Sequence, residues 1–175
     1  MSITKLRAHL TWITVNALTA RSEALHINRC RAQAQHSIQV LNSPDDNLDY
    51  NCVMYALALV DCHEYREHAR NFEVKAETPF VQYMIDCGTL VEHGDMQADD
   101  LCVYFDGATV EHIGRSISSS LVRSKWGWGR QLYEHALFEV PQTYGSAVRF
   151  YAAPERDVVL NCFVAFANME TGRGY

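Results

Sequence analysis

The chain changes its hydrophobic pattern near residue 100, and this change limits the folds that it can adopt. Beyond that point the apolar residues fall in short runs, each no longer than a typical β-strand. Turn-forming residues such as Asp106-Gly107 separate the runs. Short runs joined by short turns predict antiparallel strands, which we place at residues 101–105, 108–115, 121–125, 131–135 and 147–151.

The first hundred residues instead carry helical signals. Ala, Arg, Gln and Glu dominate residues 17–39, where apolar positions recur at helical spacing, and a loop at 42–47 ends this helix. An apolar run that begins at Cys52 predicts a buried helix. Thr78-Pro79 predicts the start of another helix, which ends before Gly88.

Helices followed by antiparallel strands predict the α+β class. At 175 residues the chain is most simply one domain. We expect residues 1–47 to form a helical N-terminal extension and residues 152–175 a C-terminal extension. Within these flanks, residues 1–16 fit either a strand or an amphipathic helix, and residues 158–166 fit a packed element of unresolved type.

The composition excludes several classes of protein. A net charge of −6 and the lack of a Lys/Arg run argue against nucleic-acid binding. No apolar segment is long enough to cross a bilayer, and the N-terminus lacks the apolar stretch of a signal peptide. We therefore expect cytoplasmic synthesis, with export by a route independent of a signal peptide left open. The six cysteines are scattered, and we expect most to be buried free thiols.

A thiol and an imidazole carry the clearest chemical signal in the sequence. Cys52 falls at the start of a predicted helix, where unpaired N–H groups favour the thiolate and could hold an oxyanion. His112 falls in a predicted strand downstream, where it could serve as the general base. This order is the one that a cysteine nucleophile and its base require, although each residue alone also fits an ordinary buried position.

Four segments in this order carry a resemblance to a known superfamily: Asn51-Cys52-Val53-Met54-Tyr55-Ala56-Leu57, Ala98-Asp99-Asp100-Leu101-Cys102-Val103-Tyr104-Phe105, Val110-Glu111-His112-Ile113-Gly114 and Val122-Arg123-Ser124-Lys125-Trp126-Gly127. They resemble the papain-like fold in its compact NlpC/P60-like form, a group of cysteine peptidases and amidases. The ending SKWG…H…VP..YG looks like that of an uncharacterised bacterial branch. The likeness covers residues 48–151.

The resemblance implies a helix-packed antiparallel sheet with Cys52 as nucleophile, His112 as base and Ser124 in the place of the third catalytic residue. It requires no cofactor and no metal. The chain departs from the family at Asn51, where an aspartate is common, and at Ser124, where His, Asn or Gln is usual. His135 is an alternative base, but its apolar neighbours favour a supporting role in a loop.

Aromatic residues near these motifs are candidates for substrate binding. They are Tyr50, Tyr55, Trp126 and Trp128, and each also fits an aromatic core. The segment from His63 to His68 looks like a zinc helix, but five residues rotate a helix by roughly 140°, so the two side chains do not share a face. We expect a charged, solvated helix there.

The sequence thus predicts a cysteine-dependent amide hydrolase, a peptidase, amidase or deamidase that acts through a thioester. Its substrate would be a peptide, a protein or a peptidoglycan-like molecule, and an effector or toxin is one setting for such an enzyme. The alternative is a catalytically inactive papain-like module with a binding or immunity role. The N-terminal helix is a candidate contact for a partner protein.

Overall fold

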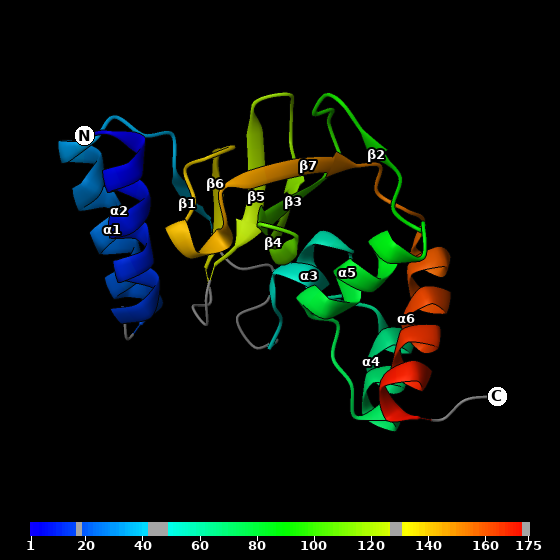
Figure 1. Ribbon diagram of the computed structural model, residues 1–175. Helices are drawn as coiled ribbons and strands as arrows, with labels where there is room; N and C mark the ends of the chain where they lie inside the picture. Colours follow the sequence, from blue (N-terminus) through cyan, green and yellow to red (C-terminus); the bar gives the residue numbers. More distant parts are fainter. Residues whose placement is uncertain (17–18, 42–48, 127–130, 173–175) are drawn as a thin grey trace.

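The computed structural model describes residues 1–16, 19–41, 49–126 and 131–172. Within them a seven-stranded antiparallel sheet is covered by six α-helices (Figure 1). The helices are α1 (Ile3–Asn16), α2 (Ala20–Gln33), α3 (Cys52–Ala56), α4 (His63–Phe72), α5 (Thr78–Asp86) and α6 (Arg156–Thr171). The strands are β1 (Gln39–Leu41), β2 (Glu92–His93), β3 (Leu101–Asp106), β4 (Thr109–Ser116), β5 (Leu121–Lys125), β6 (Leu132–Ala136) and β7 (Ala147–Tyr151). The expected α+β class is confirmed.

The strand order is β1-β6-β5-β4-β3-β7-β2, so β3, β4, β5 and β6 form a meander of neighbours in sequence. Strand β7 returns to pair with the other edge of β3. Tyr104 lies opposite His112, and directly after this pair a bulge between Tyr104 and Phe105 shifts the register of β3 against β4. All of the strands expected after residue 100 are present, with their ends shifted by no more than a residue or two.

Strand β3 is buried on both faces, which explains its continuous apolar sequence. Leu101, Val103 and Phe105 pack with α3–α6 in one hydrophobic cluster. Cys102 and Tyr104 point the other way, into a second cluster that includes residues of α1 and α2. The sheet is therefore the middle layer of three, with α1 and α2 on one side and α3–α6 on the other (Figure 1).

The N-terminal extension contains two helices, α1 and α2, followed by the edge strand β1. Residues 3–16 form α1, which resolves the ambiguity at the N-terminus in favour of a helix. The helix expected at 17–39 is the shorter α2, which is capped at its start by Thr19 and followed by the edge strand β1. The capping box of Thr19 and Ser22 begins a new helix at this point. Within the C-terminal extension, α6 includes residues 158–166, so this packed element is a helix.

Helix α3 is much shorter than its apolar sequence suggests. It spans only Cys52–Ala56, and Ala58 then adopts a left-handed backbone conformation with φ 55°. The amide of Leu59 donates to the carbonyl of Met54 at 2.8 Å, which closes the end of the helix. The apolar residues that follow pack into the core from a loop.

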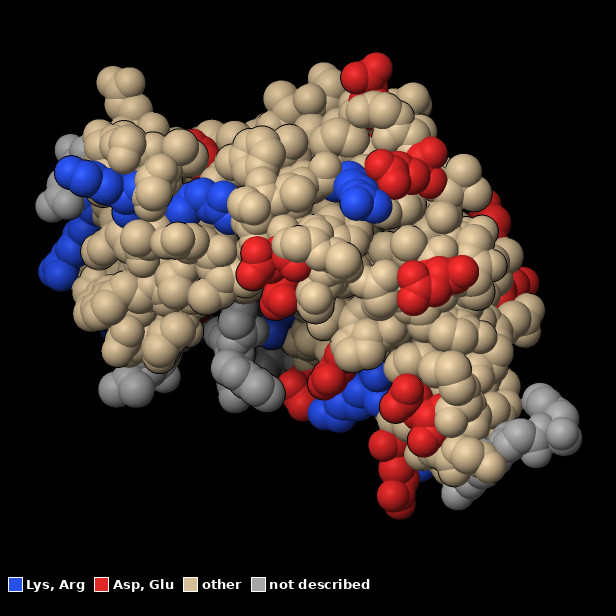
Figure 2. Space-filling model, viewed as in Figure 1, with Lys and Arg blue, Asp and Glu red and all other residues tan. Residues whose placement is uncertain are grey.

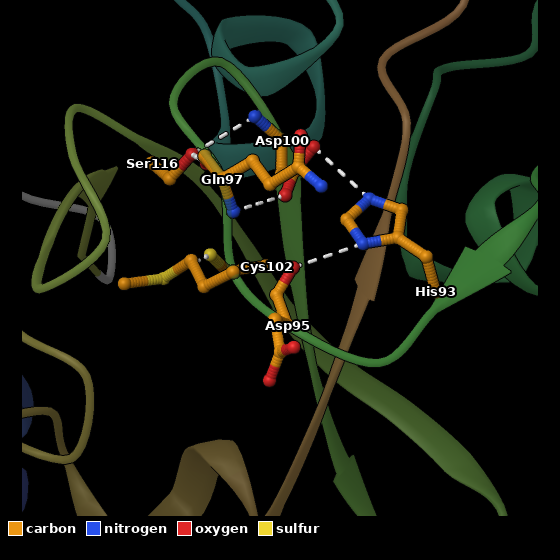
Figure 3. Close-up of polar contacts among 7 residues, drawn as sticks. His93, Asp95, Gln97, Asp100, Cys102 and Ser116 are labelled. Atoms are coloured by element: carbon orange, nitrogen blue, oxygen red, sulfur yellow. Dashed lines mark hydrogen bonds and ion pairs between the residues drawn. The ribbon is translucent and has the colours of Figure 1, made fainter.

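A polar clamp fixes the chain where it enters β3 (Figure 3). The carboxylate of Asp100 accepts from the Gln97 amide at 2.6 Å and contacts His93 Nε2 at 3.1 Å. The Asp100 amide donates to the Ser116 hydroxyl at 2.8 Å, which ties the start of β3 to the end of β4. His93 Nδ1 lies 3.0 Å from the Asp95 carbonyl oxygen, so both ring nitrogens face acceptors and both donate when the ring is protonated. Asp100, part of the motif before the histidine strand, is thus a structural anchor for β3 and β4.

Candidate functional site

Cys52 and His112 border the same cleft. It holds about 850 Å³ and lies between the start of α3, helix α4, the start of α5 and the strands β4 and β5. Figure 2 shows a hollow with both basic and acidic side chains at its rim. Basic Arg66, Arg70 and Lys75 contribute to the lining, as do acidic Asp49 and Glu111. A volume of this size is typical of a site for a small molecule or a short peptide segment.

Asn51 places Cys52 at the first position of α3. The side chain of Asn51 accepts from the Met54 amide at 2.9 Å and donates to the Ala76 carbonyl at 2.8 Å. The first contact caps the helix, and the second ties it to the segment before α5. Asn51 thus serves as the N-terminal cap of α3.

The environment of Cys52 opposes ionisation, contrary to the expectation from its place at a helix start. Burial raises the pKa of the thiol, and this effect outweighs contacts with the backbone of Ile113 and Val53 and the positive charge of Lys125. Helix α3 has only five residues, so its dipole is small. Cys52 is therefore a neutral thiol at rest and needs a base when it reacts.

His112 is buried, with 1% of its surface exposed. Its ring stacks on Tyr144 at a centroid distance of 3.9 Å, and within the described residues its Nε2 atom has no hydrogen-bond partner. Burial lowers the pKa of His112 well below its usual value, and the neighbouring His135 acts in the same direction. A neutral imidazole with an unused nitrogen is able to accept a proton.

The two residues reach the cleft from different layers. His112 pairs with Tyr104 across β3 and β4 and packs among the aromatic residues on the α1 and α2 side of the sheet. Cys52 packs against the cluster on the α3–α6 side. No hydrogen bond joins Cys52 to His112 in the part of the chain that the structure describes. Catalysis by this pair thus requires a closer approach when a substrate is bound, which is common for sites seen without ligand.

Ser124 has partners other than the one expected. Its hydroxyl lies 2.9 Å from His135 Nε2, and it accepts from Trp126 Nε1 at 2.9 Å. His135 Nδ1 lies 2.9 Å from the Ala136 carbonyl, an acceptor, so Nδ1 carries the proton and Ser124 donates to Nε2. All three side chains are fully buried. Ser124 therefore orients His135 rather than His112, and the network supports the sheet behind the cleft.

The four aromatic candidates for substrate binding fall in different places. Tyr50 borders the cleft, and the Lys125 ammonium lies 5.1 Å from the centre of its ring. Tyr55 is half-buried and does not line the cleft, and burial raises the pKa of its hydroxyl in spite of the nearby charge of Arg123 on β5. Trp126 is fully buried and stacks on Tyr133 at 4.2 Å, which corrects its expected role at the cleft. Trp128 lies outside the described residues.

Sequence reasoning missed Tyr144, which covers the His112 ring. It lies in a short 3₁₀ helix, Gln142–Tyr144, far from the cysteine motif in sequence. The structure also places Lys125, buried, at the wall of the cleft, where its charge acts on the Cys52 thiol. The alternation of β5 is the only sequence signal that could have placed Lys125 on the opposite face from Ser124.

Within the described residues, no three His, Cys, Asp or Glu side chains are grouped so as to hold a metal ion. On α4, His63 instead contacts Glu67 at 3.8 Å on the surface, and the His68 ring lies 6.5 Å from that of Phe72. None of the described helices combines the length and apolar character needed to span a bilayer, in agreement with the sequence.

No match was found for the chain among models of protein families, curated proteins or solved structures.

Proposed function

We propose that this protein is a cysteine-dependent amide hydrolase of papain-like type, with Cys52 as nucleophile and His112 as general base. The observation that carries the proposal is the shared cleft, which brings to one cavity of about 850 Å³ the half-buried thiol and a buried imidazole whose Nε2 has no hydrogen-bond partner among the described residues. The order of the two residues in the chain, at a helix start and then on an antiparallel strand, supports the same assignment.

In this mechanism an amide carbonyl enters the cleft beside Cys52. The neutral imidazole of His112 takes the thiol proton as the sulfur attacks the carbonyl carbon, which forms a tetrahedral intermediate. The backbone amides of Cys52 and Val53 contact the sulfur, and they lie where they can donate to the oxyanion. The protonated His112 then gives its proton to the leaving amine, and water hydrolyses the thioester.

The lining of the cleft favours a peptide or a side-chain amide as substrate. Arg66, Arg70 and Lys75 supply positive charge, while Glu111 supplies negative charge. Tyr50 adds an aromatic surface next to the nucleophile. Stem peptides of peptidoglycan and the glutamine side chains of proteins both present amides among charged groups, so these are the substrates to test first.

An inactive binding module is the second candidate, and one observation favours it. Burial raises the pKa of Cys52, and in the described part of the chain no polar side chain orients the His112 ring through Nε2. A fold that has lost its chemistry would retain the cleft and its aromatic and charged lining. Such a module would bind peptides without turnover.

The test is to incubate the full chain with peptidoglycan stem peptides and with glutamine-containing proteins, and to measure the amine or ammonia released. We expect turnover that Cys52→Ala removes and that the matched control Cys87→Ser, at an exposed thiol, leaves unchanged. Thermal unfolding of each variant checks that it is folded. Binding of a substrate without turnover, unaltered by Cys52→Ala, would support the inactive module and exclude the hydrolase.

A further inference from the structure

Two cysteines that do not line the cleft contact the same residue, Thr89, where α5 meets α6. Cys87 directly follows the last residue of α5 and is exposed, while Cys162 lies within α6 and is half-buried. The hydroxyl of Thr89 lies between them, 3.1 Å from Cys87 Sγ and 3.6 Å from Cys162 Sγ. Residues 75 positions apart in the sequence thus share one small polar contact at the surface.

The two thiols differ in acidity. Burial alone would raise the pKa of Cys87, but hydrogen bonds with Thr89 and Cys162 outweigh it and lower that pKa. Burial raises the pKa of Cys162, in spite of its hydrogen bond with Thr89. An exposed thiol with enhanced acidity next to a protonated one is the arrangement of an attacking cysteine and a resolving cysteine.

We propose that Cys87 and Cys162 are a redox-active dithiol that a hydroperoxide converts to a disulfide between α5 and α6. The Cys87 thiolate attacks the outer oxygen of the hydroperoxide, and the O–O bond breaks. This step forms a sulfenic acid and releases an alkoxide or hydroxide that takes up a proton. The Cys162 sulfur then attacks the sulfenic sulfur, the S–O bond breaks, and the leaving hydroxide takes the Cys162 proton to form water. The two thiols are oxidised by two electrons, and the peroxide is reduced.

The disulfide would join two helices that support the wall of the cleft. Thr78, at the start of α5, borders the cleft, and so does Tyr65 of α4. The Tyr65 ring packs against Phe163 of α6 at a centroid distance of 4.9 Å, directly after Cys162 in sequence. A covalent link between Cys87 and Cys162 would therefore restrict the movement of this wall. Formation of the link does not depend on the hydrolase activity.

The experiment treats the reduced full chain with hydrogen peroxide at low molar excess, blocks the remaining thiols and maps the peptides without reduction. We expect a peptide that joins Cys87 to Cys162, the loss of two hydrogen atoms from the intact mass, and reversal by dithiothreitol. Oxidation is expected to raise the melting temperature by about 5 °C or more, because the bond closes a long loop. In Cys162→Ser the sulfenic acid at Cys87 persists and is trapped by dimedone.

Two variants serve as controls. Cys52→Ala keeps the Cys87–Cys162 disulfide if the dithiol is independent of the cleft. Thr89→Val removes the bridging hydroxyl, and it is expected to slow the oxidation of Cys87 several-fold while the two sulfurs stay close. The proposal is overturned if Cys87 and Cys162 both remain open to alkylation after peroxide treatment. It is equally overturned if Cys87 forms only intermolecular disulfides or pairs with another cysteine.

Discussion

Two thiols of this chain occupy opposite environments. Cys52 lies in the cleft, where burial raises its pKa and where the neighbouring imidazole of His112 is neutral. Cys87 lies at the surface, where Thr89 and Cys162 lower its pKa. Each cysteine lies at the end of a helix, Cys52 at the start of α3 and Cys87 just after α5.

Position at a helix end therefore does not by itself determine the pKa of a thiol. The dipole would favour the thiolate of Cys52 and oppose that of Cys87, but both pKa shifts have the opposite sign. Burial and direct contacts therefore determine the sign of each pKa shift. Cys52 is the less acidic thiol of the two, and the proposed reaction at Cys52 therefore needs a base.

The largest expected effect comes from removing that base. We expect His112→Gln to slow acylation of Cys52 by an activated ester by about 10²–10⁴-fold, the usual contribution of a general base. His63→Gln is the matched control, because His63 also borders the cleft but is exposed on α4. The measurement is single-turnover release of p-nitrophenol. Equal rates for His112→Gln and wild type would show that Cys52 reacts without His112.

Acid should destabilise the region behind the cleft specifically. Burial lowers the pKa of His135 to about 4, from 6.5 in the unfolded chain. Between these values the unfolded state binds more protons, so stability falls as the pH drops from 6.5 to 4, by roughly 3 kcal/mol from this residue. We expect His135→Gln to flatten this part of the pH profile in urea unfolding. Parallel profiles for variant and wild type would contradict the burial of a neutral His135.

The comparison between the two thiols predicts their order of labelling. We expect iodoacetamide to modify Cys87 faster than Cys52 in the folded protein at neutral pH, because the pKa of Cys87 is lowered and that of the buried Cys52 is raised, and the thiolate is the reactive form. Peptide mapping over time measures each rate. Unfolding in urea should bring the two rates together, and a faster Cys52 in the folded state would reverse the comparison.

A smaller effect is expected from Lys125. Its charge favours the Cys52 thiolate, so Lys125→Met should slow alkylation of Cys52 by a few-fold and leave Cys87 unchanged. Lys75→Met is the control, since Lys75 also borders the cleft but forms an exposed ion pair with Asp49 at 3.6 Å. Exposed ion pairs of this kind contribute little to the stability of a protein. An equal change in the alkylation rate of Cys52 in both variants would show that Lys125 acts only through the overall positive charge of the cleft, and not through its own position next to Cys52.

The sequence was sufficient for the strands of the sheet interior but not for its edges. Runs such as 121–125 and 147–151 coincide with β5 and β7 because apolar periodicity and turn residues agree there. The edge strands β1 and β2 have three and two residues, too few to show a period. Helix α3 is shorter than predicted because Ala58 takes a left-handed conformation that a residue other than glycine does not signal.

The candidate site could be predicted only in part, for a related reason. Cys52 and His112 were identified from local motifs, and the structure brings both to one cleft. Ser124 hydrogen-bonds with His135 because the register of β5 with β6 brings the two side chains together, and no local motif specifies this register. Contacts over long sequence separations, such as Tyr144 on His112 and Cys87 near Cys162, arise from the packing of distant elements.

The most direct test of Cys52 as the nucleophile is to locate the acyl group after brief exposure of the folded chain to p-nitrophenyl acetate. Intact mass and peptide mapping after a rapid acid quench give the modified residue. We expect a single acetyl thioester on Cys52 that forms faster than on Cys87 despite the lower thiolate fraction of Cys52, because only Cys52 shares the cleft with His112 and has the amides of α3 next to it. Acetylation of Cys87 with Cys52 unmodified would contradict the assignment of the cleft as an active site.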